Sequence, residues 1–554
     1  MAVLEGGQII TKVLKQENVE YLFTLCGGTI ESIYEGCLND GIKIIDTRVD
    51  PSATMMADAY ARVTGGVGVS GVTRGPGHAA MIYGLATAHM MGSPLYSISG
   101  NSDADQIDMG GSQEYNQTGL VKPITKWTRL VAQTDRLPEY VGTGFRKALG
   151  GRPGPVHLNV PYDVLYDKID DSEIDYPQPA NSRANGRVHG DPEQIDRALK
   201  LLAGADSPVV IAAGATHWQN AAGALLDFVE ATGIPFFSRG GDVNAITRPH
   251  PLFFGMASTR FGNASKELRN ADVVLALGVK FDTNISYGGP PLFHEDAKFI
   301  CVDIDAEEMG KNRPFDVGII GDLQAVLTEM TNGVSRHDLH KPTDWVERLD
   351  LTRQAFRQRL DEAENSDSVP VHPLRICKEV RELFGDDATI SLDGGDASLF
   401  SHMALDHYHP PYLLFTGPIG GIGQGVPFAL AGKVARPDQP SVLITGDGSF
   451  GYGIIEYDTA LKHDLPIITV VSSDEAWGIV RHPQIQRYGL DRAVATDLRA
   501  VSYERLAEAL DCYGELVTKP EDIRPALQRA ADSGVPAVIN VPTTFTSAAA
   551  YCPI

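Results

Sequence analysis

The chain alternates short apolar runs with stretches of helical periodicity along most of its length. In chain order the apolar runs are "YLFTLCG", "IKIIDTR", "GVGVSGVT", "SPLYSISG", "GPVHLNVP", "PVVIAAG", "IPFFSRGG", "DVVLALG", "KFICVDID", "ATISLDGG", "SVLITGDGS", "LPIITVVSSD" and "PAVINVP". Such runs predict buried strands, and helices between them favour parallel crossover connections. The pattern therefore predicts doubly wound parallel sheets of the α/β class.

Two polar stretches divide this alternation into three blocks. The segment "YPQPANSRANGRVHG", residues 176–190, is rich in Pro, Asn and Gly and is typical of a linker. The segment "NGVSRHDLHKPTDW" closes the second block. A chain of 554 residues is also too long for one hydrophobic core. We predict three α/β domains in series, at residues 1–180, 188–335 and 365–554.

The charge balance is acidic, with 71 Asp and Glu against 47 Lys and Arg and a formal net charge of −24. This excess disfavours binding to nucleic acid or to an anionic membrane surface. No window approaches the roughly 18 uninterrupted apolar residues of a membrane span, and the first residues do not resemble a signal peptide. The six cysteines have neither metal-site nor disulfide spacing. These features predict a cytoplasmic protein.

Asp447 lies in "SVLITGDGSFGYGIIEYDTALKH", which predicts an apolar strand, a Gly-Asp-Gly-Ser turn and a helix. The backbone N–H groups of such a turn suit phosphate oxygens, and the carboxylate suits a hard cation. Taken alone, the turn is more simply explained as structural. Asp474, however, stands 27 residues later at the end of the next apolar run. Two carboxylates would then meet at the carboxyl ends of neighbouring parallel strands, where Mg²⁺ and phosphates bind.

These motifs resemble those of the thiamine diphosphate enzymes of the decarboxylase and acetolactate synthase group. That family's cofactor motif begins with GDG and ends in an Asn-Asn or Asn-Asp pair, where this chain has "SSDEAWG". The segments "GGQII", "IIDTR", "KPITKW" and "GDGSFGY" are most similar to those of benzaldehyde lyases. The resemblance implies pyrimidine-binding, middle and diphosphate-binding domains in that order. It also implies a homodimer or homotetramer with active sites between chains.

The resemblance further implies that thiamine diphosphate and Mg²⁺ are the cofactors. The metal ligands would be the Asp447 and Asp474 carboxylates and the Ala476 carbonyl. The other implied cofactor contacts are the diphosphate-binding residues Gly448, Ser449, Gly478, Ile479, Gly395 and Asp396, the apolar wedge Ile422, and the pyrimidine acceptor Gly420. Because Asp474 replaces the Asn of many relatives, it attracts the cation and repels the diphosphate, which leaves the sign of its net effect open.

Asp50 precedes Pro51 at the start of a helical stretch, and two interpretations are open. On local evidence it caps the helix, with Pro at the first helical position. By resemblance, the family places a Glu twelve residues before the Arg of a "GYAR" segment, and the same count from Arg62 reaches Asp50. Asp50 would then be the acid that contacts the pyrimidine and activates C2. Its side chain is one methylene shorter than Glu, so activation would be weaker or would need a closer backbone or a bridging water.

Further candidates concern catalysis and the substrate. Gln113 matches the active-site Gln of the family, which implies a hydrogen bond to a substrate carbonyl; the alternative is a surface loop residue. His78 follows a Gly-Pro-Gly turn, where it is either an acid or base or merely packed. Cys26 and Thr29 lie where benzaldehyde lyases and their relatives often place a His. Residues expected at the pocket mouth are Trp477, Val480, Arg481 and His482. Arg481 either pairs with a substrate carboxylate or is a solvated charge.

The resemblance implies a C–C lyase or carboligase that acts on small carbonyl substrates, namely aldehydes, 2-hydroxy ketones or 2-keto acids, through a C2 ylid and an enamine. The alternatives are a 2-keto acid decarboxylase or acetolactate synthase-type enzyme, a 2-hydroxyacyl-CoA lyase, and a catalytically inactive cofactor-binding homologue. No basic cluster for CoA phosphates is obvious. FAD is not expected in the middle domain, because "GVKFDTNISYGG" carries no nucleotide fingerprint.

Overall fold

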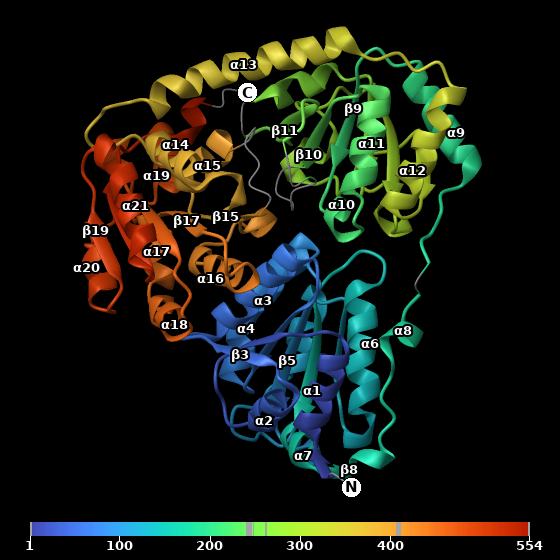
Figure 1. Ribbon diagram of the computed structural model, residues 1–554, viewed down its shortest axis with the longest axis vertical. Coiled ribbons are helices and arrows are strands. Elements are labelled where there is room, and N and C mark those ends of the chain that lie inside the picture. Colours follow the sequence, from blue (N-terminus) through green and yellow to red (C-terminus); the bar gives the residue numbers. More distant parts are fainter. Residues whose placement is uncertain are drawn as a thin grey trace. The chain divides into compact units, whose positions relative to one another are not determined.

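The computed structural model describes residues 3–184, 186–239, 246, 249–260, 263–405 and 412–551. Among these residues the chain forms three six-stranded sheets, and every strand pair within them is parallel (Figure 1). An antiparallel pair, β1 (Val3–Glu5) with β8 (Lys168–Asp170), is additional. The predicted α/β class with three parallel sheets is confirmed. The last two residues of the predicted run "IPFFSRGG", 240 and 241, lie outside the described residues.

The strand order of the first sheet reverses between β2 (Tyr21–Thr24) and β4 (Gly68–Val72). In sheet order its strands are β3 (Lys43–Asp46), β2, β4, β5 (Leu95–Asn101), β7 (Val156–Pro161) and β6 (Trp127–Leu130). Its helices are α1 (Gly6–Gln16), α2 (Glu31–Asp40), α3 (Asp50–Thr64), α4 (Pro76–Met91), α5 (Gln117–Val121), α6 (Leu137–Leu149), α7 (Tyr162–Tyr166) and α8 (Pro179–Ser182). The chain leaves β2 toward one edge and returns at β4 toward the other. Ligands of open α/β sheets bind at such a switch point.

The second sheet has the order β11-β10-β9-β12-β13-β14. Its strands are β9 (Pro208–Ala212), β10 (Phe236–Arg239), β11 (Phe253–Ala257), β12 (Val273–Leu277), β13 (Lys298–Asp303) and β14 (Val317–Ile320). Its helices are α9 (Pro192–Ala203), α10 (Ala215–Trp218), α11 (Ala222–Thr232) and α12 (Leu323–Gly333), and α13 (Thr343–Glu364) follows. Asp191 and Asp322 cap α9 and α12 with their carboxylates.

The third sheet repeats the topology of the first, because its order is β16-β15-β17-β18-β20-β19. Its strands are β15 (Thr389–Asp393), β16 (Tyr412–Leu414), β17 (Ser441–Gly446), β18 (Ile468–Ser473), β19 (Tyr513–Leu516) and β20 (Ala537–Pro542). The helices of this part of the chain are α14 (Pro373–Phe384), α15 (Asp396–Leu405), α16 (Gly425–Ala435), α17 (Asp447–Gly453), α18 (Glu456–Lys462), α19 (Gly478–Tyr488), α20 (Tyr503–Glu508) and α21 (Ile523–Ser533). The switch point lies between β15 and β17.

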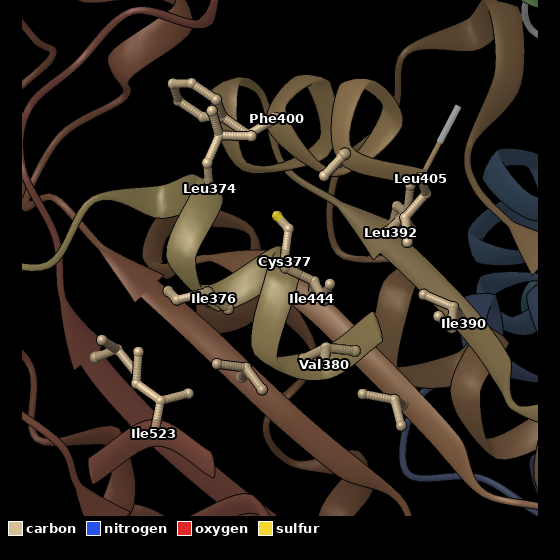
Figure 2. Close-up of a cluster of buried hydrophobic side chains, with 14 of the residues drawn as sticks. Leu374, Ile376, Cys377, Val380, Ile390, Leu392, Phe400, Leu405, Ile444 and Ile523 are labelled. Atoms are coloured by element: carbon tan, nitrogen blue, oxygen red, sulfur yellow. The ribbon is translucent and has the colours of Figure 1, made fainter. Parts of the chain in front are cut away.

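A buried apolar cluster holds helices against this third sheet (Figure 2). Leu374, Ile376, Cys377 and Val380 of α14 gather with side chains of β15, β17, α15 and α21. The labelled partners are Ile390, Leu392, Phe400, Leu405, Ile444 and Ile523. Burial of such side chains stabilises the fold by roughly 1.5–3 kcal/mol each. The packing fixes the strands whose carboxyl ends carry the turns described below.

The described residues separate into two compact units. One contains Met1–Gly186 together with Ile419–Pro437 and Ile455–Leu465, so α16 and α18 pack with the first sheet. The Phe428 ring of α16 lies 5.0 Å from the guanidinium of Arg62 on α3, which also pairs with Asp58. The other unit contains Arg187–Pro418, Asp438–Ile454 and Pro466–Ile554. No described helix is both long enough and apolar enough to span a membrane.

Candidate cofactor and active site

Three carboxyl groups gather at the carboxyl ends of neighbouring strands in the third sheet. Asp396 begins α15 after β15, Asp447 begins α17 after β17, and Asp474 follows β18. The N–H of Glu475, the residue after Asp474, donates to Asp447 Oδ2 at 2.9 Å. A Cβ on Gly478 would lie 2.8 Å from Asp474 Oδ2 and 2.9 Å from Asp396 Oδ2. The structure therefore brings the two predicted metal ligands together and adds a third carboxyl beside them.

The surroundings of these carboxyl groups disfavour their charged forms and raise their pKa values. Burial, followed by the charge of Asp447, raises the pKa of Asp474 to about 7. Burial raises the pKa of Asp447 to about 6, although the Gly448 and Glu475 N–H groups act in the opposite direction. Burial also raises the pKa of Asp396, whose Oδ2 has no hydrogen-bond partner among the described residues. A bound cation would offset the repulsion and the lost solvation together.

The glycines of these turns lie where a Cβ would collide with neighbouring atoms. Gly394 has φ +91°, and a Cβ there would lie 3.0 Å from the Gly446 nitrogen and 3.2 Å from Ser449 Oγ. A Cβ on Gly395 would lie 2.3 Å from the Ile479 side chain, and one on Gly448 would lie 2.5 Å from the Trp477 ring. A turn without Cβ atoms allows an anion to approach backbone N–H groups. This cradle at a switch point suits a diphosphate.

The described residues include no group of three or more His, Cys, Asp or Glu side chains arranged to hold a metal ion by themselves. Mg²⁺ in proteins usually binds through one or two carboxylates and shares substrate phosphates and water. Asp447 and Asp474 would supply the carboxylates of such a site. The Ala476 N–H donates to Asp474 Oδ1 at 3.2 Å, and the role of its carbonyl as a ligand stays a prediction. The two carboxyl groups beside the glycine turns fit a magnesium–diphosphate group.

Other contacts support these turns and were not predicted. The Tyr503 hydroxyl donates to the backbone carbonyl of Asp447 at 2.7 Å, and the Ala548 N–H donates to Asp396 Oδ1 at 2.9 Å. The ring of His482 stacks on Phe545 at 4.0 Å, and its Nε2 lies 3.9 Å from Asp396 Oδ2. No motif in the sequence links these distant residues to the GDGS turn, so pattern analysis had no signal for them.

The residues expected at the pocket mouth take different positions. Trp477 packs on Gly448, whereas Val480 is 51% exposed. Ile479, which was predicted to bind the diphosphate, is 42% exposed, and that role stays a prediction. Arg481 forms an ion pair with Asp497, and its guanidinium also lies 5.6 Å from the centre of the Phe545 ring. The Arg481 charge is thus already paired, which is neither of the two states considered from the sequence.

Asp50 belongs to the first unit and does not act as the predicted helix cap. The helix α3 starts at Asp50 itself, its N-cap residue is Val49, and no side chain caps it. The Asp50 carboxylate instead faces the Gly-Pro-Gly turn, because a Cβ on Gly77 would lie 2.8 Å from Asp50 Oδ1. Burial raises the pKa of Asp50, although its own backbone N–H lowers it. The cap hypothesis is therefore wrong, and the half-buried carboxylate is left for another role.

The turn before Asp50 is held by a carboxylate from α18. Glu456 is fully buried and accepts hydrogen bonds from the backbone N–H groups of Arg48, at 3.1 and 3.2 Å, and Val49, at 3.1 Å. The Thr459 hydroxyl donates to the same carboxylate at 2.6 Å. Glu456 follows Asp447 by nine residues in the sequence, and its apolar neighbours gave no sign of this function. It fixes the backbone from which Asp50 projects.

His78 is fully buried on α4. Its Nδ1 lies 2.6 Å from the Tyr115 hydroxyl, which donates to the Gly75 carbonyl at 3.1 Å. Its ring centre is 5.0 Å from that of His157, and its Nε2 has no partner among the described residues. Burial lowers the pKa of His78 to about 4, so the ring is neutral near pH 7. The role of His78 as an acid or base stays a prediction.

Gln113 and Thr29, which were predicted separately, line one pocket of about 600 Å³. The other lining residues are Gly27, Gly28, Thr73, Arg74, Asp103, Gln106 and Tyr162. Gln113 has a left-handed backbone with φ +63°, and its backbone lies directly against Gly75. Cys26 is exposed and does not line the pocket. Gln117, which was not predicted, is buried and ties Gly75 to Gly100 through its amide.

The predicted wedge segment also lies in the first unit. The Ile422 carbonyl accepts a hydrogen bond from the Tyr83 hydroxyl at 2.8 Å, and the Gln424 amide donates to Thr87 at 3.0 Å. Both contacts attach the segment to α4. Gly420 has φ +61°, with no atom near the position of a Cβ. The roles predicted for Gly420 and Ile422 toward a cofactor stay predictions.

Comparison with known proteins identifies the family of this chain. Residues 4–120, 195–330 and 393–541 match the thiamine pyrophosphate enzyme N-terminal TPP binding domain, central domain and C-terminal TPP binding domain. The chain is 33% identical to the acetolactate synthase large subunit of Mycobacterium tuberculosis over 98% of its own length and 96% of the relative's. It is 30% identical to the acetolactate synthase isozyme 3 large subunit of Escherichia coli, over 96% and 93% of the two chains. It is also 28% identical to human 2-hydroxyacyl-CoA lyase 2, over 98% and 90%. The chain therefore belongs to the thiamine pyrophosphate enzymes, in the group that includes acetolactate synthases.

Proposed function

We propose that the protein is a thiamine diphosphate- and Mg²⁺-dependent C–C lyase or carboligase for aldehydes, 2-hydroxy ketones or 2-keto acids. The observation that carries the proposal is the convergence of Asp447 and Asp474, with raised pKa values, on a glycine-lined turn at the switch point of the third sheet. Its fit to a magnesium–diphosphate group and the similarity to acetolactate synthases and 2-hydroxyacyl-CoA lyases support the same conclusion.

In this proposal, residues of the chain bind and orient the cofactor and exchange a proton with it. Asp447 and Asp474 would hold the cation, and the N–H groups in the first turns of α17 and α19, including those of Gly448 and Gly478, would receive the diphosphate. When bound, the cofactor supplies an electron sink for the carbanion that forms beside a carbonyl. The Asp50 carboxyl would contact the pyrimidine ring of the cofactor. Because burial raises the pKa of Asp50, its carboxyl holds a proton more readily than an exposed Asp does.

Exchange of the C2 proton of bound thiamine diphosphate in deuterium oxide tests the proposal. We expect exchange much faster than in the free cofactor, and exchange at the rate of the free cofactor would instead support an inactive cofactor-binding homologue. Products from pyruvate, benzoylformate, benzaldehyde, benzoin and formyl-CoA would then separate a carboligase or lyase from a simple decarboxylase, an acetolactate synthase-type enzyme and an acyl-CoA lyase.

We also infer that the protein works as a homodimer or homotetramer with sites between chains. Support comes from the family and from a set of large apolar side chains that are more than half exposed on and just after α19. These are Val480, Tyr488, Leu490 and Val494. Exposed apolar side chains that gather in one region often mark an interface. Sedimentation of the protein at micromolar concentration tests the inference, and a monomer that retains C2 exchange would contradict it.

A further inference from the structure

The pocket that contains Thr29 and Gln113 lies at the switch point of the first sheet. Gly27, Gly28 and Thr29 follow β2, and Thr73 and Arg74 follow β4, so both sides of the reversal in strand order contribute to the lining. This is the place in an open α/β sheet where ligands bind. The third sheet, with the same strand order, places the GDGS turn at its own switch point. The position alone therefore predicts a small-molecule site.

Arg74 is the one cationic side chain in the lining of this pocket. Within the described ranges its side chain has no hydrogen-bond or ion-pair partner, and its Nε is buried. Asp103 lines the same pocket, but it accepts a hydrogen bond from the Gln106 amide at 2.9 Å and forms no ion pair with Arg74. A partly buried guanidinium without a partner is costly, and an anionic ligand would satisfy it.

The Arg74 backbone is fixed in place. Its N–H donates to the Thr29 hydroxyl at 3.3 Å, and that hydroxyl lies 2.9 Å from the Thr73 hydroxyl. Gly77, which abuts Asp50 Oδ1, would carry a Cβ only 3.0 Å from Thr73 Cγ2. A short series of contacts thus joins the activating carboxylate to the pocket. A ligand held by Arg74 would lie near the group that Asp50 is proposed to activate.

We propose that Arg74 binds the carboxylate of an acidic substrate, so that the enzyme selects 2-keto acids over neutral aldehydes and hydroxy ketones. The planar guanidinium matches a carboxylate with two parallel hydrogen bonds. Arg481, the residue first considered for this role, is already paired with Asp497. This inference rests on the proposed function and narrows its substrate class.

Ligand binding to the holoenzyme tests the inference. The wild type and the variants Arg74→Gln and Arg74→Lys are loaded with Mg²⁺ and 3-deazathiamine diphosphate, which cannot react at C2, and titrated with benzoylformate or with its neutral methyl ester. We expect Arg74→Gln to weaken benzoylformate binding by about tenfold to a hundredfold and to leave ester binding unchanged. Arg74→Lys should fall between, because the ammonium keeps the charge but not the fork. Arg146→Gln, on the exposed face of α6, is the control and should bind both ligands like the wild type.

Three results would overturn the inference. They are a wild type with no preference for the acid over the ester, a variant Arg74→Gln that binds both as the wild type does, and equal weakening of both ligands. The inference would also be rejected if Arg74→Gln lost formyl-CoA binding but kept benzoylformate binding, because Arg74 would then recognise a phosphate. C2 proton exchange with thiamine diphosphate itself separates the two proposals. Fast exchange in Arg74→Gln together with unchanged selectivity rejects only the role of Arg74, whereas slow exchange in the wild type rejects the proposed function.

Discussion

Replacing Gly478 by Ala should weaken cofactor binding at least tenfold without unfolding the protein. The new Cβ would lie 2.8 Å from Asp474 Oδ2 and 2.9 Å from Asp396 Oδ2, whereas ordinary contacts begin near 3.4 Å. Each carboxylate would have to move by about half an ångström. Neither is free to do so, because Asp474 Oδ1 accepts the Ala476 N–H and Asp396 Oδ1 accepts the Ala548 N–H. Overpacking of this kind typically costs about 1–3 kcal/mol.

The larger effect of Gly478→Ala should be on the affinity for Mg²⁺. Metal–ligand distances tolerate only about 0.2 Å, so a carboxylate displaced by half an ångström is a poor ligand. We expect the affinity for Mg²⁺ and thiamine diphosphate to fall at least tenfold, which is about 1.4 kcal/mol. Isothermal titration with the cofactor measures this loss. Thermal unfolding with and without the cofactor reports the same change as a smaller stabilisation by the ligand.

The matched control is Gly223→Ala. Gly223 lies in the first turn of α11, and a Cβ there would meet no atom within 4 Å. This variant should bind the cofactor like the wild type and be equally stable or more stable by up to about 1 kcal/mol. The argument is refuted if Gly478→Ala takes up the cofactor with wild-type affinity, or if both variants lose affinity equally.

Three further predictions concern the first unit. Asp50→Asn should slow C2 proton exchange of bound thiamine diphosphate by about a hundredfold or more, whereas Asp50→Glu should retain fast exchange. Equal exchange rates in Asp50→Asn and the wild type would exclude Asp50 as the activator. Glu456→Ala leaves the Arg48 and Val49 N–H groups without their acceptor, so urea unfolding should show a loss of about 1–3 kcal/mol, and an unchanged midpoint would contradict this. His78 has a folded pKa of about 4 against 6.5, so the folded chain binds fewer protons than the unfolded chain between these values, and stability should fall by up to about 3 kcal/mol as pH drops through that window. The variant His78→Gln should reduce this slope in urea titrations at about pH 7.5 and about pH 5, and an identical slope would refute the assignment.

The interior strands of each sheet could be predicted, whereas most edge strands could not. The strands that the apolar runs did not identify in the three sheets are β6, β11, β14, β16 and β19, and each lies at a sheet edge. Interior strands such as β17 and β18 are buried on both faces and have continuous apolar sequences. An edge strand such as β19 is only partly buried, and its sequence "YGEL" lacks that signal.

The same contrast holds for the candidate site. Asp447 and Asp474 could be predicted because a motif, its spacing and two flanking strands agreed. Arg74 and Glu456 could not, because their roles depend on contacts that only folding creates: a pocket shared with Thr29 in one case and the backbone before Asp50 in the other. For Asp50, local pattern favoured a cap, although the structure starts the helix one residue earlier than that pattern requires.

The location of α16 and α18 limits how this protein can be divided. Both helices come from the last third of the sequence yet pack with the first sheet, where α16 lies against α3 and Glu456 satisfies the turn before it. A fragment ending at residue 186 would expose the flank of α3 that α16 covers and would leave the Arg48 and Val49 N–H groups without their acceptor. We therefore expect the first unit to fold only when these later segments are present. After limited proteolysis or domain exchange between relatives, residues 1–186 should stay folded only if residues 419–437 and 455–465 are also present.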